Sequence, residues 1–356
     1  MSVRQILVLL FCALISPMVQ ALPTLTAATA GEGAWLTGLL AFPALLVMYA
    51  VVHLLLRTVP GGGLAQVFQM VLGKVLGGAL TILYGVWALF LLCLHARLYA
   101  ERMLSVGYRN ASMAILLLVL LAMLLWQCSK KLAAFARSVE IFYLALSLGL
   151  GLVLFFSVSQ MALENVLPIW VEDLPGIATA TLVPLGVAGM GIYAAFLGGQ
   201  IAPRDGDKKR CVKWLAVACL VMAALQFGVL GQLGPELSVE IDQPFFVVAE
   251  SVGIYGAFQR VESVIIALWV FSDLALLGLL VFSCRTMVGA ILGERRRRWL
   301  VPALLALTFL GAMFLLPDEF MAREVASRGM LIGNLILGCA VPALLLLVRR
   351  VKQALA

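Results

Sequence analysis

The sequence predicts an all-α polytopic membrane protein, with about ten transmembrane helices arranged as two inverted repeats of five helices. Three observations predict this class. Hydrophobic residues make up 63% of the 356 residues and charged residues 12%, so there is too little polar surface to cover a soluble globule. The apolar residues form runs of roughly 20, the length that crosses a bilayer core about 30 Å thick. Two of these runs are interrupted at matching places in the order.

Helices are the expected elements because they satisfy their own backbone hydrogen bonds in lipid, and no alternating strand pattern competes with them. The expected spans are 5–27, 34–56, 76–98, 111–128, 139–158, 177–200, 212–233, 260–284, 299–316 and 329–348. The whole chain, 1–356, is then one membrane domain. Its first five-helix repeat covers 5–158 and its second covers 177–348.

The net charge of +7 follows the topology of the chain rather than a polyanionic partner. With the N-terminus inside, the expected cytoplasmic side holds 19 of the 25 Lys and Arg residues, including the run Arg295 to Arg298. This asymmetry is the positive-inside rule, so both termini are expected in the cytoplasm and no nucleic-acid partner is needed.

The first span also resembles a secretory signal peptide, with a small residue, Ala21, at a candidate cleavage site. Cleavage there would leave one span fewer. We expect the segment to be retained, because its apolar stretch continues past that site through Leu22, Leu25 and Ala28, longer than a typical signal core.

The two interrupted helices are the first of each repeat. Ser16 and Pro17 lie near the middle of the first span, where proline removes a backbone hydrogen bond. The sixth span carries Pro184 followed by glycines at Gly186, Gly189 and Gly191. Weak helices at equivalent positions in two halves indicate an inverted-repeat transporter fold with a substrate site at the breaks. The alternative is that these glycines only pack helices closely together.

The eighth span carries a carboxylate at membrane depth. Glu262, Ile266, Trp269 and Asp273 fall at helical spacing on one face, which is expected to point into the bundle. Asp273 then either contacts a ligand or cation, or joins neighbouring helices by hydrogen bonds. For Arg260 and Glu262, at the mouth of this span, we expect an architectural or gating role.

The segment "QPFFVVAESVGIYGAFQRVESVIIALW" at 243–269 resembles the signature of the spore germination proteins of the GerAB and GerKB type, the permease-like B subunits of nutrient germinant receptors. "AGEGAWLTGLLAFPALLVMY" at 30–49 resembles the entry to that family's second span, and "VLGKVLGGALTILYGVWAL" at 71–89 resembles the entry to its third. Each motif is short and apolar, so their order and spacing carry the resemblance.

The resemblance implies the amino acid–polyamine–organocation superfamily, with a leucine-transporter-like fold of ten spans whose first and sixth are unwound. It implies an amino acid or similar small nutrient as ligand. It also implies a complex with a larger A-type membrane subunit and a C-type lipoprotein, in the spore inner membrane if the host sporulates. Gln200 departs from the pattern, because an acidic residue is expected near the inner end of the sixth span.

The residues predict a binding site rather than an active site. No catalytic triad, phosphate loop or paired-carboxylate motif is present at useful spacing, and the two His and seven Cys residues are scattered, so no enzyme activity, cofactor or metal site is expected. Opened helices expose backbone groups that suit an amino acid. The candidate ligand-binding residues are Ser16, Pro17, Gly186, Gly189, Gly191 and Asp273, with Tyr84, Trp87, Tyr193 and Trp269 shaping the pocket.

Three functions fit this site. A germinant-receptor subunit would bind a nutrient and signal to its partner subunits. A secondary amino acid transporter would use the same site for alternating access. A purely structural subunit would bind nothing.

Overall fold

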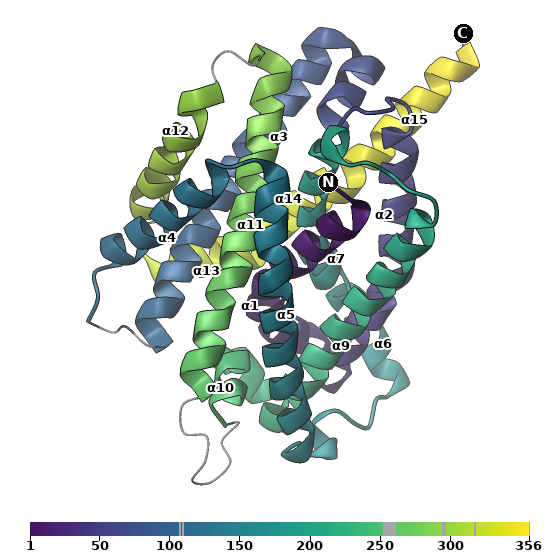
Figure 1. The fold of residues 1–356 in the computed structure, drawn as a ribbon. Helices are drawn as coiled ribbons and strands as arrows, with labels where there is room; N and C mark the ends of the chain where they lie inside the picture. The colour runs from purple at the N-terminus through teal and green to yellow at the C-terminus, as the bar shows by residue number, and fades with distance from the viewer. Residues whose placement is uncertain (107, 109, 252–260, 294–296, 317, 356) are drawn as a thin grey trace.

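The computed structural model describes residues 1–106, 108, 110–251, 261–293, 297–316 and 318–355, and for residues 106, 261–268 and 297–298 it describes the backbone alone. The described residues form helices and their connections, and the one β-type pairing among them is an isolated bridge between Ser2 and Ala202. Figure 1 shows the helices gathered into one bundle. The predicted all-α class is confirmed.

The first half of the chain consists of long helices. They are α1 (Val3–Ala30), the 3-10 turn η1 (Gly31–Trp35), α2 (Leu36–Leu56), α3 (Leu64–Val106), α4 (Met113–Cys128) and α5 (Leu132–Ser159). Two 3-10 turns follow, η2 (Leu163–Asn165) and η3 (Val171–Asp173). They lead to a segmented stretch made of α6 (Leu174–Ala180), α7 (Leu182–Gly189), the 3-10 turn η4 (Met190–Ile192), α8 (Tyr193–Phe196) and η5 (Gly198–Gln200).

The rest of the chain returns to longer helices and then alternates α- and π-helical pieces. The longer elements are α9 (Asp207–Glu240), α10 (Pro244–Ser251), α11 (Val261–Leu292) and α12 (Arg297–Leu310). The alternating pieces are η7 (Gly311–Leu315), α13 (Glu319–Glu324), η8 (Val325–Met330), α14 (Leu331–Leu335), η9 (Ile336–Ala340) and α15 (Val341–Leu355), in which η7, η8 and η9 are π-helical.

In the described part of the chain, seven helical stretches are long and apolar enough to cross a membrane, and two shorter apolar helices accompany them. One stretch, Val3–Leu56, contains two of the expected spans. Six further expected spans each overlap one of the other six stretches, and the spans 111–128 and 299–316 overlap the two shorter helices. This arrangement agrees with a polytopic membrane protein. Ten crossings and the inverted repeat stay predictions.

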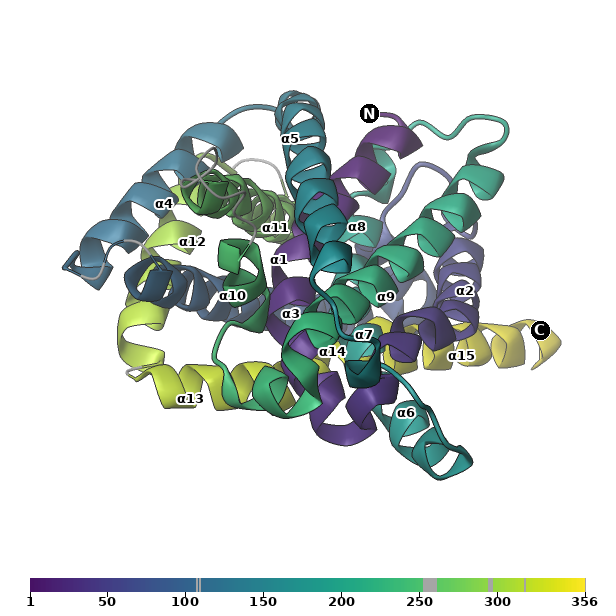
Figure 2. The ribbon, with the colours of Figure 1, turned by 90° about the horizontal axis from the view of Figure 1, so that it is seen from below.

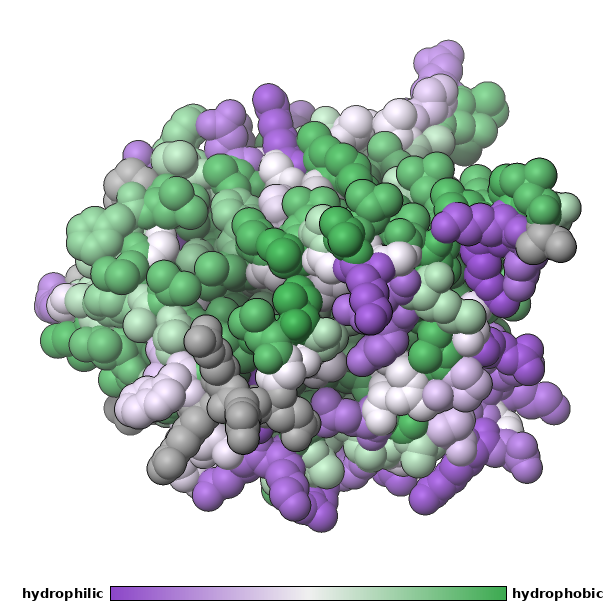
Figure 3. Space-filling view, turned by 90° about the horizontal axis from the view of Figure 1, so that it is seen from above, coloured by the Kyte–Doolittle hydropathy of each residue, from purple (hydrophilic) through white to green (hydrophobic). Residues whose placement is uncertain are grey.

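The surface of the helices is apolar where a lipid bilayer would meet it. Large side chains such as Val47, Trp126 and Phe155 are mostly exposed on α2, α4 and α5. Figure 3 shows one end of the molecule, where apolar side chains cover much of the surface and hydrophilic ones gather along its margin. Exposed apolar surface of this extent is unfavourable in water. Together with the apolar helices, it identifies an integral membrane protein.

The helix α1 lies inside the bundle. It packs against α9, α11 and α5 (Figure 2). The helix α11 in turn packs against α3. Residues far apart in the sequence therefore meet in the core, because α1 covers Val3–Ala30 and α11 covers Val261–Leu292.

The predicted break in the first span differs from an unwound segment. The helix α1 continues past Pro17 without unwinding, although one backbone hydrogen bond is opened. The N–H of Ser16 donates to Ser272 Oγ at 2.8 Å, and the Ser272 hydroxyl donates to the carbonyl oxygen of Cys12 at 2.6 Å. A side chain inserted into the backbone ladder in this way bends or widens a helix without ending it. Pro17 removes the donor of the next backbone hydrogen bond.

The predicted break in the sixth span is a change of helix type. The helices α7 and α8 are joined by the 3-10 turn η4, and the backbone angles at Met190 and Ile192 are still right-handed helical. The stretch is therefore segmented rather than unwound. A mid-helix 3-10 stretch is a common feature of hinges and strained sequences.

Candidate functional site

A cluster of charged and polar side chains lies in the core where α1, α3 and α11 meet. Asp273 on α11 is 2% exposed and forms an ion pair with Arg102 of α3, which is 1% exposed. The hydroxyl of Ser16 donates to Asp273 Oδ1 at 2.6 Å and accepts from Arg102 Nη1 at 3.2 Å. Three helices are thus connected through one carboxylate, one guanidinium and one hydroxyl.

The local sequence explains why the cluster forms at Ser16. The inserted Ser272 hydroxyl holds the Ser16 backbone, and Asp273, the next residue on α11, holds the Ser16 side chain. Two consecutive residues of α11 therefore bind the turn of α1 that precedes Pro17. Such a site fits the rule that ionisable groups at membrane depth face the bundle interior and pair with one another.

A cavity of about 260 Å³ adjoins this cluster, beside the connection between α9 and α10. It is lined by the second half of α1, the end of α3, the segment around Asp242, and the helices that follow Glu319. The helix α9 changes direction at Gly234, where φ is +75°, a conformation that glycine adopts without steric penalty. The residues after this kink form one wall of the cavity.

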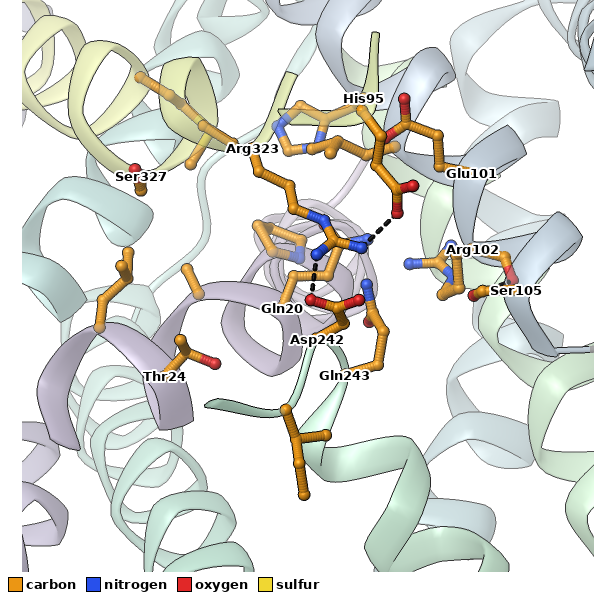
Figure 4. A pocket seen from close by; sticks show the side chains of 18 of the residues that line it. Gln20, Thr24, His95, Glu101, Arg102, Ser105, Asp242, Gln243, Arg323 and Ser327 are labelled. Carbon is orange, nitrogen blue, oxygen red and sulfur yellow. Dashed lines mark hydrogen bonds and ion pairs between the residues drawn. The ribbon is translucent and has the colours of Figure 1, made fainter. Parts of the chain in front are cut away.

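Figure 4 shows the polar side chains of this cavity, with Arg102 and Ser105 on one side, Thr24 and Ser327 on the other, and Arg323 between them. Arg323 donates to the carboxylates of Asp242 and Glu319, which are largely solvent-exposed. The cavity therefore borders the buried ion pair through Arg102 and also contains a more exposed group of charges.

The structure brings three of the predicted ligand-binding residues to this place. Pro17 lines the cavity, while Ser16 and Asp273 form the cluster beside it. Trp269 is not among the lining residues of the cavity and is separated from Arg102 by one side chain. It packs against Phe246, whose ring lies below the guanidinium of Arg102 at 5.8 Å from its centroid.

The predicted glycines lie apart from the cavity lining. A Cβ at Gly189 would come 2.6 Å from the carbonyl oxygen of Asn334, and one at Gly186 would come 2.9 Å from Leu331. These two glycines therefore allow α7 and α14 to approach closely, as the close-packing alternative describes. Gly191 has only an ordinary contact, with Leu10 at 3.8 Å. A ligand-binding role for the three glycines stays a prediction.

The predicted tyrosines lie in a separate aromatic cluster. The hydroxyl of Tyr84 donates to the carbonyl oxygen of Leu337 at 2.5 Å, and that of Tyr193 donates to the carbonyl oxygen of Tyr84 at 3.2 Å. Both rings pack against Phe196 and neither side chain lines the cavity. Trp87 lies near them and donates to the side chain of Asn334 at 3.0 Å.

The remaining predicted residues lie at the limit of the description. Arg260 is outside the described residues, and Glu262 is described by its backbone alone. Among the described residues, no group of three or more His, Cys, Asp or Glu side chains is placed to hold a metal ion.

Sequence reasoning did not identify Arg102, which follows the predicted third span, 76–98. A signal was available, because a carboxylate predicted at membrane depth requires a partner of opposite charge. Arg97 lies within the predicted third span and Arg102 follows it closely, while Arg260 begins the predicted eighth span itself. The sequence did not show that the helix α3 continues to Val106 and so includes Arg102.

The model of the spore germination protein family matches residues 1–320 of the chain. The chain belongs to this family. No curated protein matches the chain. The match includes the whole Ser16, Arg102 and Asp273 cluster of this spore germination protein, while Arg323 lies beyond the matched residues. Membership identifies a permease-like membrane protein connected with spore germination.

Proposed function

We propose that this chain is the membrane subunit of a spore nutrient germinant receptor, which binds an amino acid or a similar small nutrient in the cavity next to Arg102 and Asp273. The observation that carries the proposal is the cavity itself, whose lining includes Arg102, the cation of a buried ion pair that also contacts the Ser16 hydroxyl. Buried charges at membrane depth are costly and mark functional sites by default.

The size and charge of the cavity support a small zwitterionic ligand. Its volume of about 260 Å³ is below the range of roughly 300–1,000 Å³ usual for drug-sized ligands. Arg102 and Asp273 neutralise one another, so a ligand with a net charge would leave that charge uncompensated in the interior. An amino acid carries both charges and adds no net charge.

Binding would act on the position of α1. Arg102 contacts both Asp273 and the Ser16 hydroxyl, so a ligand that attracts Arg102 also changes the contacts of the turn before Pro17. A ligand that interacts differently with two arrangements of the bundle shifts their populations. In our proposal an A-type membrane subunit and a C-type lipoprotein detect this shift, in the spore inner membrane, with both termini of this chain in the cytoplasm.

A secondary amino acid transporter is the second candidate function. The segmented helix between Leu174 and Gln200 favours it, because discontinuous helices are typical of transporters. The permease-like character of the family fits both functions.

Uptake by the purified full chain in liposomes distinguishes the two. The probes are radiolabelled L-alanine, L-leucine and L-phenylalanine, each tested in the presence and absence of a proton or sodium gradient. If the chain is a receptor subunit, the bound label should be proportional to the amount of protein, and no label should accumulate in the lumen. Accumulation that depends on a gradient and is abolished by an ionophore would show that the chain is a transporter. Empty liposomes and liposomes with heat-denatured protein are the controls.

A further inference from the structure

The end of α3 presents two more buried polar side chains to the cavity, within two turns of Arg102. His95 is 3% exposed and Glu101 is 8% exposed, and both line the cavity together with Arg102. One carboxylate oxygen of Glu101 accepts from Arg97 Nε at 2.5 Å. Helical spacing places His95 and Arg102 on one face of α3, with Glu101 about 100° around the helix from Arg102.

Each of these three side chains has a buried polar atom without a hydrogen-bond partner among the described residues. The atoms are Nε2 of His95, the second carboxylate oxygen of Glu101, and Nε of Arg102. A buried polar atom left unpaired costs free energy, and native structures rarely leave several together without a reason. The three atoms are themselves buried, but they belong to side chains that line one cavity, so a rotation of these side chains would present an acceptor and a donor to a ligand there.

We propose that Glu101 is a ligand-binding residue that receives the ammonium group of the ligand, while Arg102 receives its carboxylate through Nε. This inference rests on the proposed function and adds the residue that binds the ammonium end of the ligand. The carboxylate oxygen of Glu101 accepts hydrogen bonds, which suits an ammonium group, and Arg102 Nε donates, which suits a carboxylate. His95 adds a polar side chain to the same wall.

The charges of the site favour a ligand that carries both groups. Arg97 with Glu101 and Arg102 with Asp273 are two buried ion pairs, each with no net charge. A zwitterion preserves that balance. An amine without a carboxylate, or a carboxylate without an amine, leaves one uncompensated charge in the interior, which is unfavourable.

Melting of the full chain, purified in detergent, tests the inference. The probes are L-alanine, L-leucine and L-phenylalanine, each beside its carboxylic acid analogue without the amino group and its amine analogue without the carboxylate. A ligand that binds the folded state raises the melting temperature with its concentration, which gives an apparent Kd. The variant is Glu101→Gln, which keeps the volume and a contact to Arg97 but removes the charge. The matched control is Glu319→Gln, a carboxylate of the same cavity that is half exposed and already bound by Arg323.

The inference predicts that at least one amino acid stabilises the wild type and binds at least about tenfold more tightly than both of its analogues. Glu101→Gln should weaken the amino acid by at least about tenfold and should not weaken the carboxylic acid analogue, because the ammonium contact is lost while Arg102 is retained and Arg97 no longer has its charge balanced. Glu319→Gln should leave both unchanged within about threefold. If Glu101→Gln does not fold, the comparison of amino acid and analogues in the wild type still decides.

Two outcomes would overturn the inference in different ways. Equal binding of an amino acid and its carboxylic acid analogue, or equal binding by the wild type and Glu101→Gln, removes Glu101 from the site and leaves the proposed function standing. No stabilisation of the wild type by any of the three amino acids contradicts the proposed function, and the inference fails with it.

Discussion

Arg102 and Asp273 bring opposite charges into the core of a bundle whose interior is otherwise mostly apolar. Each is costly to bury alone, and each is tolerated because the other neutralises it and Ser16 satisfies part of the remaining hydrogen-bonding capacity. The pair therefore has two separable properties. One is a contribution to folding, which depends on charge balance, and the other is ligand binding, which depends on the particular groups.

A pair of variants separates these properties. Arg102→Met alone leaves a buried carboxylate uncompensated, so we expect a loss of about 3–5 kcal/mol of stability, seen as a lower melting temperature in detergent and a lower yield. Arg102→Met combined with Asp273→Leu removes both charges, so most of that loss should be recovered.

The double variant should nevertheless show no stabilisation by amino acids, because Arg102, which would bind the carboxylate of the ligand, is gone. A double variant that folds and still binds amino acids as the wild type does would show that the ion pair only joins helices. That result would support the helix-joining alternative for Asp273.

At the scale of the element, α1 shows how a helix carries a local defect without ending. The defect is supplied by another helix, since Ser272 of α11 occupies the place between the Ser16 N–H and the Cys12 carbonyl. The sequence showed Pro17 and so indicated weakness in the right turn, but proline alone does not decide between a kink and an unwound segment. That choice depends on which side chain of a distant helix reaches the opened turn.

Removing the inserted hydroxyl tests this reading of α1. Ser272→Ala leaves both the Ser16 N–H and the Cys12 carbonyl without the bridging group, so we expect a loss of about 1–3 kcal/mol. The matched control is Ser283→Ala on the same helix, where the hydroxyl donates to the carbonyl oxygens of Tyr193 and Leu279 and no N–H depends on it.

The control should cost about 1 kcal/mol or less. Melting temperatures of the two variants in the same detergent give the comparison. Equal losses would mean that α1 closes its own hydrogen bond once the hydroxyl is removed, and that Ser272 does not hold the turn open.

For the whole molecule, composition and the length of the apolar runs were sufficient to predict an all-helical membrane protein, because these properties follow from the solvent around the chain. The resemblance of three short motifs was sufficient to predict the family, which the family match confirms. The individual residues of the site were harder to predict. Asp273 was identified from its cost at membrane depth, while its partner Arg102 and the second carboxylate Glu101 depend on how α3 packs.

The glycines show how a packing role and a binding role give the same sequence pattern. Proline and glycine in one short stretch indicated a binding segment, but the structure shows that Gly186 and Gly189 face the backbone and side chains of α14 at close range. Small residues serve both purposes in membrane helices, and spacing alone does not separate them. A ligand at Gly191 would lie in a different part of the bundle from the cavity near Arg102.

The location of the ligand is the central claim, and a structure determined by electron cryo-microscopy of the full chain with a stabilising amino acid at saturating concentration tests it most directly. We expect density for one amino acid in the cavity lined by Pro17, Glu101 and Arg102, with its carboxylate toward Arg102 and its ammonium group toward Glu101. Ligand density between α1 and the segment from Gly186 to Gly191, with the cavity near Arg102 unchanged, would contradict it.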